Sequence, residues 1–206
     1  MVPVHRNLTI LQGKTFDQAI RWETEPIVYK AITGITQAAP CVVTCPGHGM
    51  PDGWRAAITS VKGMRQINAA NTPPRDSDYR QITYKTADTF ELNDVNSADF
   101  LAYTSGGYVQ YYSPKHISET YAARMSIKDR IGGAELFRLT SENGRIEVNL
   151  NFLAGIITSI RLLIPATDTA ALTWKHGVYD LELESYRGVV TALLYGTVAV
   201  VPEVTT

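Results

Sequence analysis

The stretch that decides the fold class is Val178–Glu184, with the sequence VYDLELE. Its apolar and acidic side chains alternate, so Tyr179, Leu181 and Leu183 share one face of an extended chain and three carboxylates share the other. Strict alternation is typical of an antiparallel strand with one face on a core and the other in water. The stretch therefore predicts a half-buried sheet.

Similar short runs recur along most of the 206 residues, separated by clusters of Gly, Asn, Asp and Pro. Tyr121–Ile127, for example, alternates in the same way. Helix is expected only as short turns at Pro165–Leu172 and Ser97–Leu101, where alanine and a leading proline favour it. Many short strands at close spacing predict an all-β protein of sandwich or barrel type.

Composition excludes several classes of protein. The formal net charge is −1, so the basic excess of a nucleic-acid-binding protein is missing. No apolar run approaches the roughly 18 residues that a membrane helix needs. Residues 1–12 do not form a signal-peptide core, because polar and charged residues interrupt them. We therefore expect synthesis in the cytoplasm and no membrane insertion.

The chain changes its organisation at two prolines, Pro26 and Pro114, which bracket a block with its own turns. We predict a discontinuous β-sandwich of residues 1–26 and 114–206, with a small β-barrel of residues 27–113 inserted in one of its loops. Exposed loops whose ends lie close together tolerate such insertions.

Three further segments carry structural predictions. The strand near Thr15–Trp22 should pair with strands after residue 117 in the outer domain. Asn143–Gly144 is typical of a type I′ hairpin turn. Residues 1–7 and 202–206 are short extended ends that are able to add to the sheet edge of a neighbour.

Cys41 and Cys45 lie in the run PCVVTC, which has the pattern of a short strand. Both thiols and Val43 would then share one face and enter a core. The two cysteines would lie about 13 Å apart, at roughly 3.3 Å per residue, which is too far for a disulfide. A zinc site with His48 is the alternative, but it needs a fourth ligand that no second cluster offers.

Motifs of catalysis are missing from the sequence, including the phosphate loop, the dinucleotide fingerprint and the metalloprotease helix. The histidines are scattered, at His5, His48, His116 and His176. His48 lies between two glycines, and we expect its ring to bond local backbone groups. Asp88 should likewise bond backbone N–H groups while Phe90 enters the core. We predict no catalytic, cofactor-binding or metal-binding residue, and no enzyme activity.

The outer segments resemble a family of small phage and prophage virion proteins. The resemblance rests on ordered motifs that cover about half of the chain: Gln12–Phe16, Tyr121–Asp129, Glu142–Ile146, Gly177–Leu183 and Leu194–Thr205. The family's fold is similar to the immunoglobulin-like N-terminal domain of phage baseplate upper proteins. The resemblance thus implies an immunoglobulin-like sandwich in a virion component.

The middle block resembles a recurrent phage tail module, through Ile32–Thr36, Pro40–Gly49, Asp88–Leu92 and Ala102–Gly107. That module is a small β-barrel similar in fold to the first catalytic-cysteine half-domain of ubiquitin-activating enzymes. This half-domain carries no reactive cysteine, so the resemblance implies no ubiquitin chemistry.

The block departs from the module at residues 69–78, an extra polar loop that contains two adjacent prolines. Within it, arginines near Asp76 and Asp78 suggest salt bridges from Arg75 and Arg80. This loop and a tyrosine-rich strand are the candidate contacts with a partner, because tyrosine is enriched at interfaces. The candidate partner-binding residues are Tyr108, Tyr111, Tyr112, Pro73, Pro74 and Arg75.

The predicted function is that of a structural virion protein of a tailed bacteriophage, a tail or baseplate component that bridges the tail to peripheral fibres or spikes. Its expected partners are other tail proteins, with several symmetry-related copies in the particle. A head or neck decoration or completion protein is one alternative. A carbohydrate-binding module for the host surface is another, and would need exposed aromatics such as Tyr108 or Trp54.

Overall fold

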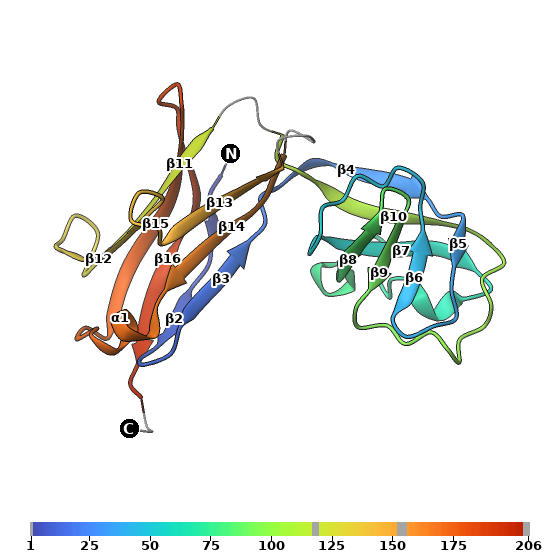
Figure 1. Cartoon of the computed structure of the whole chain (residues 1–206), viewed down its shortest axis with the longest axis horizontal. Helices are drawn as coiled ribbons and strands as arrows, with labels where there is room; N and C mark the ends of the chain where they lie inside the picture. The colour runs from blue at the N-terminus through green and yellow to red at the C-terminus, as the bar shows by residue number, and fades with distance from the viewer. Residues whose placement is uncertain (1, 117–119, 152–155, 204–206) are drawn as a thin grey trace. The chain divides into compact units, whose positions relative to one another are not determined.

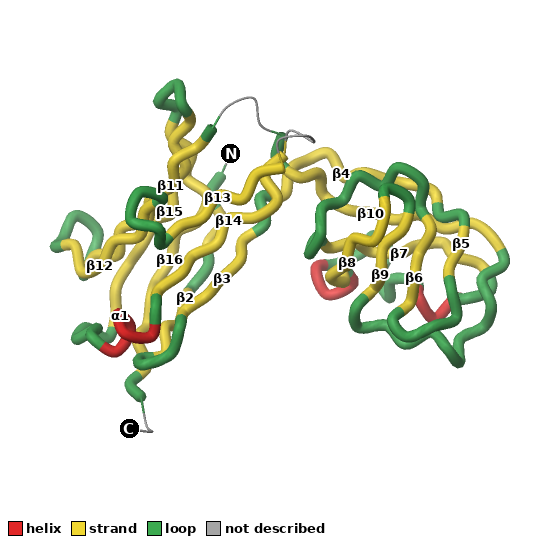
Figure 2. Tube along the Cα trace, viewed as in Figure 1, coloured by secondary structure: helices red, strands yellow, loops and turns green. Residues whose placement is uncertain are grey.

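The computed structural model describes residues 2–116, 120–151 and 156–203. Strands dominate, and the helices of the described residues are one short α-helix, α1 (Ala166–Ala170), and two 3-10 turns at Arg65–Ile67 and Asp76–Asp78 (Figure 2). The predicted all-β fold class is therefore confirmed. None of these helices is long or apolar enough to cross a bilayer.

The chain forms two compact units. Unit 1 comprises the chain up to Arg21 and from His116 onward, and unit 2 comprises Trp22–Lys115. Unit 2 thus lies between the two segments of unit 1 in the sequence. The predicted boundary residues Pro26 and Pro114 both lie inside strands of unit 2.

Unit 1 contains two sheets, and the smaller lies over the larger (Figure 1). The larger has the strand order β1-β16-β15-β11-β12, with β2 also paired to β16, and the smaller has the order β13-β14-β3. Their strands are β1 (Val4–His5), β2 (Leu8–Leu11), β3 (Phe16–Ile20), β11 (Tyr121–Lys128), β12 (Glu135–Thr140), β13 (Ile146–Asn151), β14 (Ile156–Ile164), β15 (His176–Ser185) and β16 (Val190–Val201).

Alternating side chains build the core of unit 1, as the sequence predicts. In β15, Tyr179, Leu181 and Leu183 are buried, and the acidic residues between them lie on the opposite face. β3 pairs antiparallel with β14, from Ile20 opposite Ile160 to Phe16 opposite Ile164. The predicted pairing of the early strand with later strands is confirmed.

Two local predictions in unit 1 have different outcomes. The turn at Pro165–Leu172 is helical, as α1. The type I′ hairpin at Asn143–Gly144 is wrong, because such a turn requires positive φ at both central residues and only Gly144 has it. Moreover, the segment joins β12 to β13, which belong to different sheets. The Asn143 Oδ1 instead accepts the backbone N–H groups of Thr140 and Arg145, at 2.9 and 3.1 Å.

The N-terminal segment belongs to the large sheet. β1 and β2 both run parallel to β16, with Val4 opposite Leu194 and Leu8 opposite Val198. The prediction of residues 1–7 as a docking arm is therefore corrected, because Val4 and His5 already form ladder pairs within their own chain. Residues 202–203 lie outside any strand, and 204–206 lie outside the described residues.

Unit 2 contains one seven-stranded sheet of order β4-β10-β7-β8-β9-β6-β5. The two ends of this order are consecutive in the chain. Between them, the backbone N–H of Ile32 donates to Gly107 O at 3.0 Å, and that of Thr33 donates to Thr44 O at 2.9 Å. One bent segment thus joins both ends and closes the sheet on itself. The strands are β4 (Glu23–Ala31), β5 (Gly34–Ile35), β6 (Cys41–Thr44), β7 (Arg55–Lys62), β8 (Arg80–Thr86), β9 (Thr89–Leu92) and β10 (Ser105–Pro114).

The interior of unit 2 is a contiguous apolar cluster that includes Trp54, Phe90, Cys41, Val43 and Cys45. The segment Ser97–Leu101 does not form the predicted helical turn. It forms a β-turn, in which the Phe100 N–H donates to Ser97 O at 3.1 Å. The Ser97 hydroxyl is buried and donates to the carbonyls of Thr36 and Ala38, so a polar side chain ties this turn to the barrel.

Candidate partner-binding surface

Strands β4, β10 and β7 are neighbours in the sheet of unit 2 and form one part of its outer surface (Figure 1). Directly opposed residues of antiparallel strands point to the same side of the sheet. Tyr112 of β10 lies opposite Ile27 of β4, and Gln110 lies opposite Tyr29. On the other side of β10, Tyr108 lies opposite Thr59. All of these side chains therefore point outward.

Four tyrosines gather on this face: Tyr29, Tyr79, Tyr108 and Tyr112, which we call the tyrosine face. Tyr29 is 58% exposed and Tyr108 is 48% exposed, so both rings are accessible to a partner. Tyr79 precedes β8, and its ring lies 5.9 Å from the ring of Tyr112. Burial raises the pKa of Tyr79, and the neighbouring Tyr112 and Tyr29 raise it further. The tyrosine face is thus formed by residues that lie far apart in the sequence.

Arg55 anchors one side of the tyrosine face. Its guanidinium donates two hydrogen bonds to the Glu23 carboxylate, both at 2.7 Å, and one to Asp76 at 2.5 Å. The same guanidinium lies 5.4 Å from the centre of the Tyr79 ring. The Glu23 carboxylate holds the pKa of Arg55 above its usual range. Since a bidentate pair fixes orientation, Arg55 holds Tyr79 in place.

The extra loop, residues 69–78, is ordered by Asp78. Its carboxylate accepts hydrogen bonds from the Ala70 N–H at 3.1 Å, the Asn71 side-chain amide at 3.0 Å and the Arg75 N–H at 2.8 Å. The Arg75 N–H is the main cause that lowers the pKa of Asp78. Asp76 of this loop and Tyr79 both contact Arg55, so the loop adjoins the tyrosine face.

The structure places the predicted partner residues in two groups. Tyr108 and Tyr112 lie on the tyrosine face, and Pro73, Pro74 and Arg75 lie in the adjoining loop, with Pro73 and Arg75 exposed. The prediction of Tyr111 as a partner-binding residue is wrong. It points into the barrel with 4% exposure, and its hydroxyl donates to the carbonyl of His48.

Trp54 is not the exposed aromatic residue that a carbohydrate-binding module requires. Its side chain is fully buried, and the indole Nε1–H donates to Tyr112 O at 2.9 Å. It supports the tyrosine face from inside the barrel. The predicted salt bridges of the loop also differ, because Arg80 pairs with Asp94 and Asp76 pairs with Arg55.

The cysteines and His48 are structural groups. Cys41, Val43 and Cys45 are buried, as predicted, and both thiols are free. Burial raises the pKa of Cys41 and raises that of Cys45 to about 11, so neither is an effective nucleophile near neutral pH. In the described part of the chain, no cluster of three His, Cys, Asp or Glu residues could hold a metal.

His48 is fully buried, and both ring nitrogens bond the backbone. Nδ1 accepts the Met50 N–H at 3.2 Å, and Nε2 lies 2.9 Å from Thr86 O. The predicted structural role is confirmed. Asp88 also bonds the backbone as predicted, since its Oδ1 accepts the Gly47 N–H at 2.8 Å.

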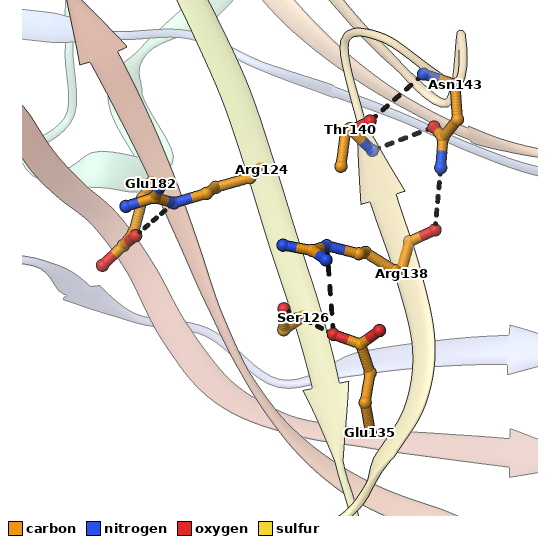
Figure 3. A network of polar contacts seen from close by, with 7 residues as sticks. All are labelled: Arg124, Ser126, Glu135, Arg138, Thr140, Asn143 and Glu182. Carbon is orange, nitrogen blue, oxygen red and sulfur yellow. Dashed lines mark hydrogen bonds and ion pairs between the residues drawn. The ribbon is translucent and has the colours of Figure 1, made fainter. Parts of the chain in front are cut away.

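On unit 1, the paired carboxylates Glu182 and Glu184 lie on the outer face of the large sheet, as expected. Both accept hydrogen bonds from Arg124, at 2.8 and 3.1 Å. Figure 3 shows the Glu182 pair beside a second group on β11 and β12, in which Glu135 accepts from Ser126 at 3.0 Å. These carboxylates form ion pairs within the sheet.

Two tyrosines of the face, Tyr29 and Tyr79, were not predicted from the sequence. Alternation along the strand offers a partial signal, because Tyr108, Gln110 and Tyr112 point to one face while Tyr111 points to the other. Tyr29 lies on this face because β4 pairs with β10, and no local sequence pattern predicts that pairing.

The arrangement offers aromatic contact area beside the paired charges of Arg55, Glu23 and Asp76, which suits recognition of another macromolecule. Neither a scan of protein-family models nor a search of curated proteins finds a match for the chain.

Proposed function

We propose that this chain is a non-enzymatic structural protein of a tailed bacteriophage particle, a tail or baseplate component that bridges the tail to peripheral fibres or spikes. The motif resemblances of both sequence blocks support a virion role. The observation that carries the bridging role is the tyrosine face. In this proposal unit 1 docks on the particle, and unit 2 offers the tyrosine face to the next component.

Two features of the tyrosine face favour a protein partner. Tyrosine supplies large contact area at low cost in side-chain entropy, and it is enriched among interface residues that dominate binding energy. The charges beside it form the Arg55, Glu23 and Asp76 cluster, so docking leaves few charges without a partner.

The first test is immunogold electron microscopy of purified particles, with antibody against this chain. We expect gold at the distal tail. Gold on the head or neck would move the chain to a decoration or completion role. No signal on either intact or denatured particles would overturn the virion role altogether.

The second test concerns the tyrosine face itself. A phage that lacks the gene is complemented with the double variant Tyr29→Ser, Tyr108→Ser. We expect the chain to fold and to lose its next component, with at least about a tenfold drop in fibres per particle. The matched control is Leu101→Ser, an exposed apolar residue of unit 2 outside the tyrosine face. Equal fibre content in both variants would contradict the bridging role of this face.

Binding of a host glycan is the second candidate function. It is favoured by the half-exposed ring of Tyr108 beside the Gln110 amide, which donates to Thr59 at 2.8 Å. Aromatic rings with adjacent polar groups are suited to stacking on sugars. A glycan array with the purified chain separates the two functions, because a bridging protein should bind no glycan.

A further inference from the structure

The large sheet of unit 1 ends in an exposed apolar turn. The turn that joins β15 to β16 presents Tyr186 with 86% exposure and Val189 with 61%, and Val190 follows with 43%. The Gly188 N–H donates to Ser185 O at 2.8 Å, and the Ser185 N–H donates to Val189 O at 2.9 Å. We call residues 186–190 the tip. Single exposed apolar residues are ordinary, but three gathered on one hydrogen-bonded turn mark an interaction site.

The opposite end of the same sheet carries a half-open pocket of about 520 Å³, which we call the hollow. Strands β11, β15, β16 and β1 supply its walls, and the loop between β11 and β12 supplies Ile131, which is 93% exposed. The volume falls within the range of roughly 300–1,000 Å³ that is typical of binding pockets. Its lining includes His5, Lys128, Ile131, Val178, Asp180 and Tyr195.

The tip and the hollow cannot meet within one chain. Register places Lys128 opposite Val178 at one end of β15 and Tyr121 opposite Ser185 at the other. Asp180 and Tyr186 are six residues apart along this strand, or about 20 Å in extended chain. Because β15 and β16 stay paired between them, with one bulge after Leu181, the sheet holds the tip away from the hollow of its own copy.

The middle of this outer face is closed by its own ion pairs. Arg124 binds Glu182 and Glu184. Figure 3 shows its pair with Glu182, and Glu135 in contact with both Ser126 and Arg138. Charged side chains that are already paired offer little to a binding partner. The exposed apolar side chains of this face lie at its two ends instead.

We propose that copies of this chain associate head to tail through unit 1, with the tip of one copy seated in the hollow of the next. The lining of the hollow is largely apolar, through Ile131, Val178 and Tyr195, so it suits the apolar side chains of Tyr186 and Val189. In this contact Lys128 of the hollow faces the Tyr186 ring of the tip, a favourable cation–π partner. The contact joins two different surfaces, so it builds a closed ring or an open chain of copies. This association does not depend on where in a particle the chain resides.

The test uses the purified full chain and two variants. The tip variant is Tyr186→Ser, Val189→Ser, and the hollow variant is Ile131→Asp, Tyr195→Asp. Sedimentation analysis gives the mass distribution as concentration rises to about 1 mM, the range of weak association. We expect the unaltered chain to form assemblies larger than a dimer and each variant alone to be a monomer.

Mixing the two variants gives the decisive result. The tip variant keeps an intact hollow, and the hollow variant keeps an intact tip, so a mixture retains one productive contact. We expect the mixture to form dimers that grow no further. Leu101→Asp in unit 2 is the control and should assemble like the unaltered chain.

Three outcomes would overturn the proposal. They are a monomeric unaltered chain at about 1 mM, variants that assemble as the unaltered chain does, and a mixture of folded variants that yields no dimer. Thermal unfolding of each variant establishes that it is folded. If a double variant does not fold, the single variants Tyr186→Ser and Ile131→Asp replace it, since both alter highly exposed side chains.

Discussion

Unit 1 and unit 2 solve the same problem, the unpaired edges of a sheet, in different ways. Unit 1 stacks two sheets and leaves edge strands with one partner each, namely β1, β2 and β12 in the larger sheet and β3 and β13 in the smaller. Unit 2 closes its only sheet through the bend at Ile32–Thr33. Closure removes edges, but it forces the connecting loops to cover the barrel ends. Buried polar side chains tie loops in both units, His48 and Ser97 in unit 2 and Thr169 and Ser185 in unit 1.

The largest effect should follow from His48→Ala in unit 2. The change removes a buried ring and leaves the Met50 N–H and the Thr86 carbonyl without partners. We expect unit 2 to lose about 3 kcal/mol of stability. Reactivity of the two buried thiols in denaturant measures this, since both cysteines lie in unit 2. An unchanged unfolding midpoint would show that the loops of unit 2 do not depend on His48.

Gly196→Ala should produce the next largest effect, in unit 1. A Cβ at this position would lie 2.2 Å from Arg6 O, so the N-terminal strands must move away from β16. We expect a loss of about 2 kcal/mol. Hydrogen exchange of the amides of β1 and β2 should accelerate in this variant. Gly34→Ala is the control, because its Cβ would meet only ordinary contacts at 3.4 Å or more.

Rising pH should lower the stability of unit 2 before that of unit 1, with a smaller effect than the two substitutions. The pKa of Cys45 is raised from 9.0 to about 11, so folding stabilises the protonated thiol. This contribution is complete below pH 9 and is lost as pH rises towards 11. We expect unit 2 to lose about 1 kcal/mol between pH 8 and 10, because the unfolded thiol ionises first. Unfolding of Cys45→Ala across this range should show a flatter dependence on pH.

Alkaline unfolding of unit 1 should begin at higher pH. Burial raises the pKa of Tyr179 to about 12, above the usual value of 10.0. Its contribution is therefore lost only above pH 10. Equal losses in both units between pH 8 and 10 would contradict the assignment of this step to the thiols.

The smallest effect concerns the surface pair of Asp17 and Arg161 in unit 1, whose side chains lie 2.6 Å apart. The hydrogen bond from Arg161 lowers the pKa of Asp17, so its stabilisation is present above the unfolded pKa and is lost as pH falls through the folded pKa. Because both side chains are well exposed and screened by water, we expect this contribution to be the smallest of those considered. Asp17→Asn should lower the stability of unit 1 at low salt. In 1 M salt the substitution should have little effect, because salt already screens the ion pair.

Sequence reasoning succeeded where the signal is local. Alternation in β11 and β15 predicts which side chains are buried, and parity in β6 predicts the shared face of Cys41, Val43 and Cys45. The turn residues around His48 predict its bonds to the backbone. In each case the periodicity of a strand or the geometry of a turn determines the outcome within a few residues.

The predictions from the sequence failed where the pairing of strands that are distant in the sequence determines the structure. Residue parity separates Tyr111 from Tyr108 and Tyr112, but which face of β10 is inward follows from its pairing with β4 and β7. Asn143–Gly144 joins two sheets, although the same residue pair is typical of hairpins within one sheet. The pairing of β1 with β16 escaped prediction for the same reason, since almost the whole chain separates them.

That last pairing has a consequence for the order of events during synthesis. Every residue of unit 2 has been made once Lys115 is joined, so its barrel is able to close while the ribosome is still at work. Unit 1 must wait, because β1 and β2 find their ladder partner only when β16 emerges. Until then its first strands are unpaired and open to wrong partners. The closed barrel pairs Glu23 with Pro114, so it brings the ends of the two unit 1 segments together. We therefore expect the finished barrel to hold the early strands near the later ones as these emerge.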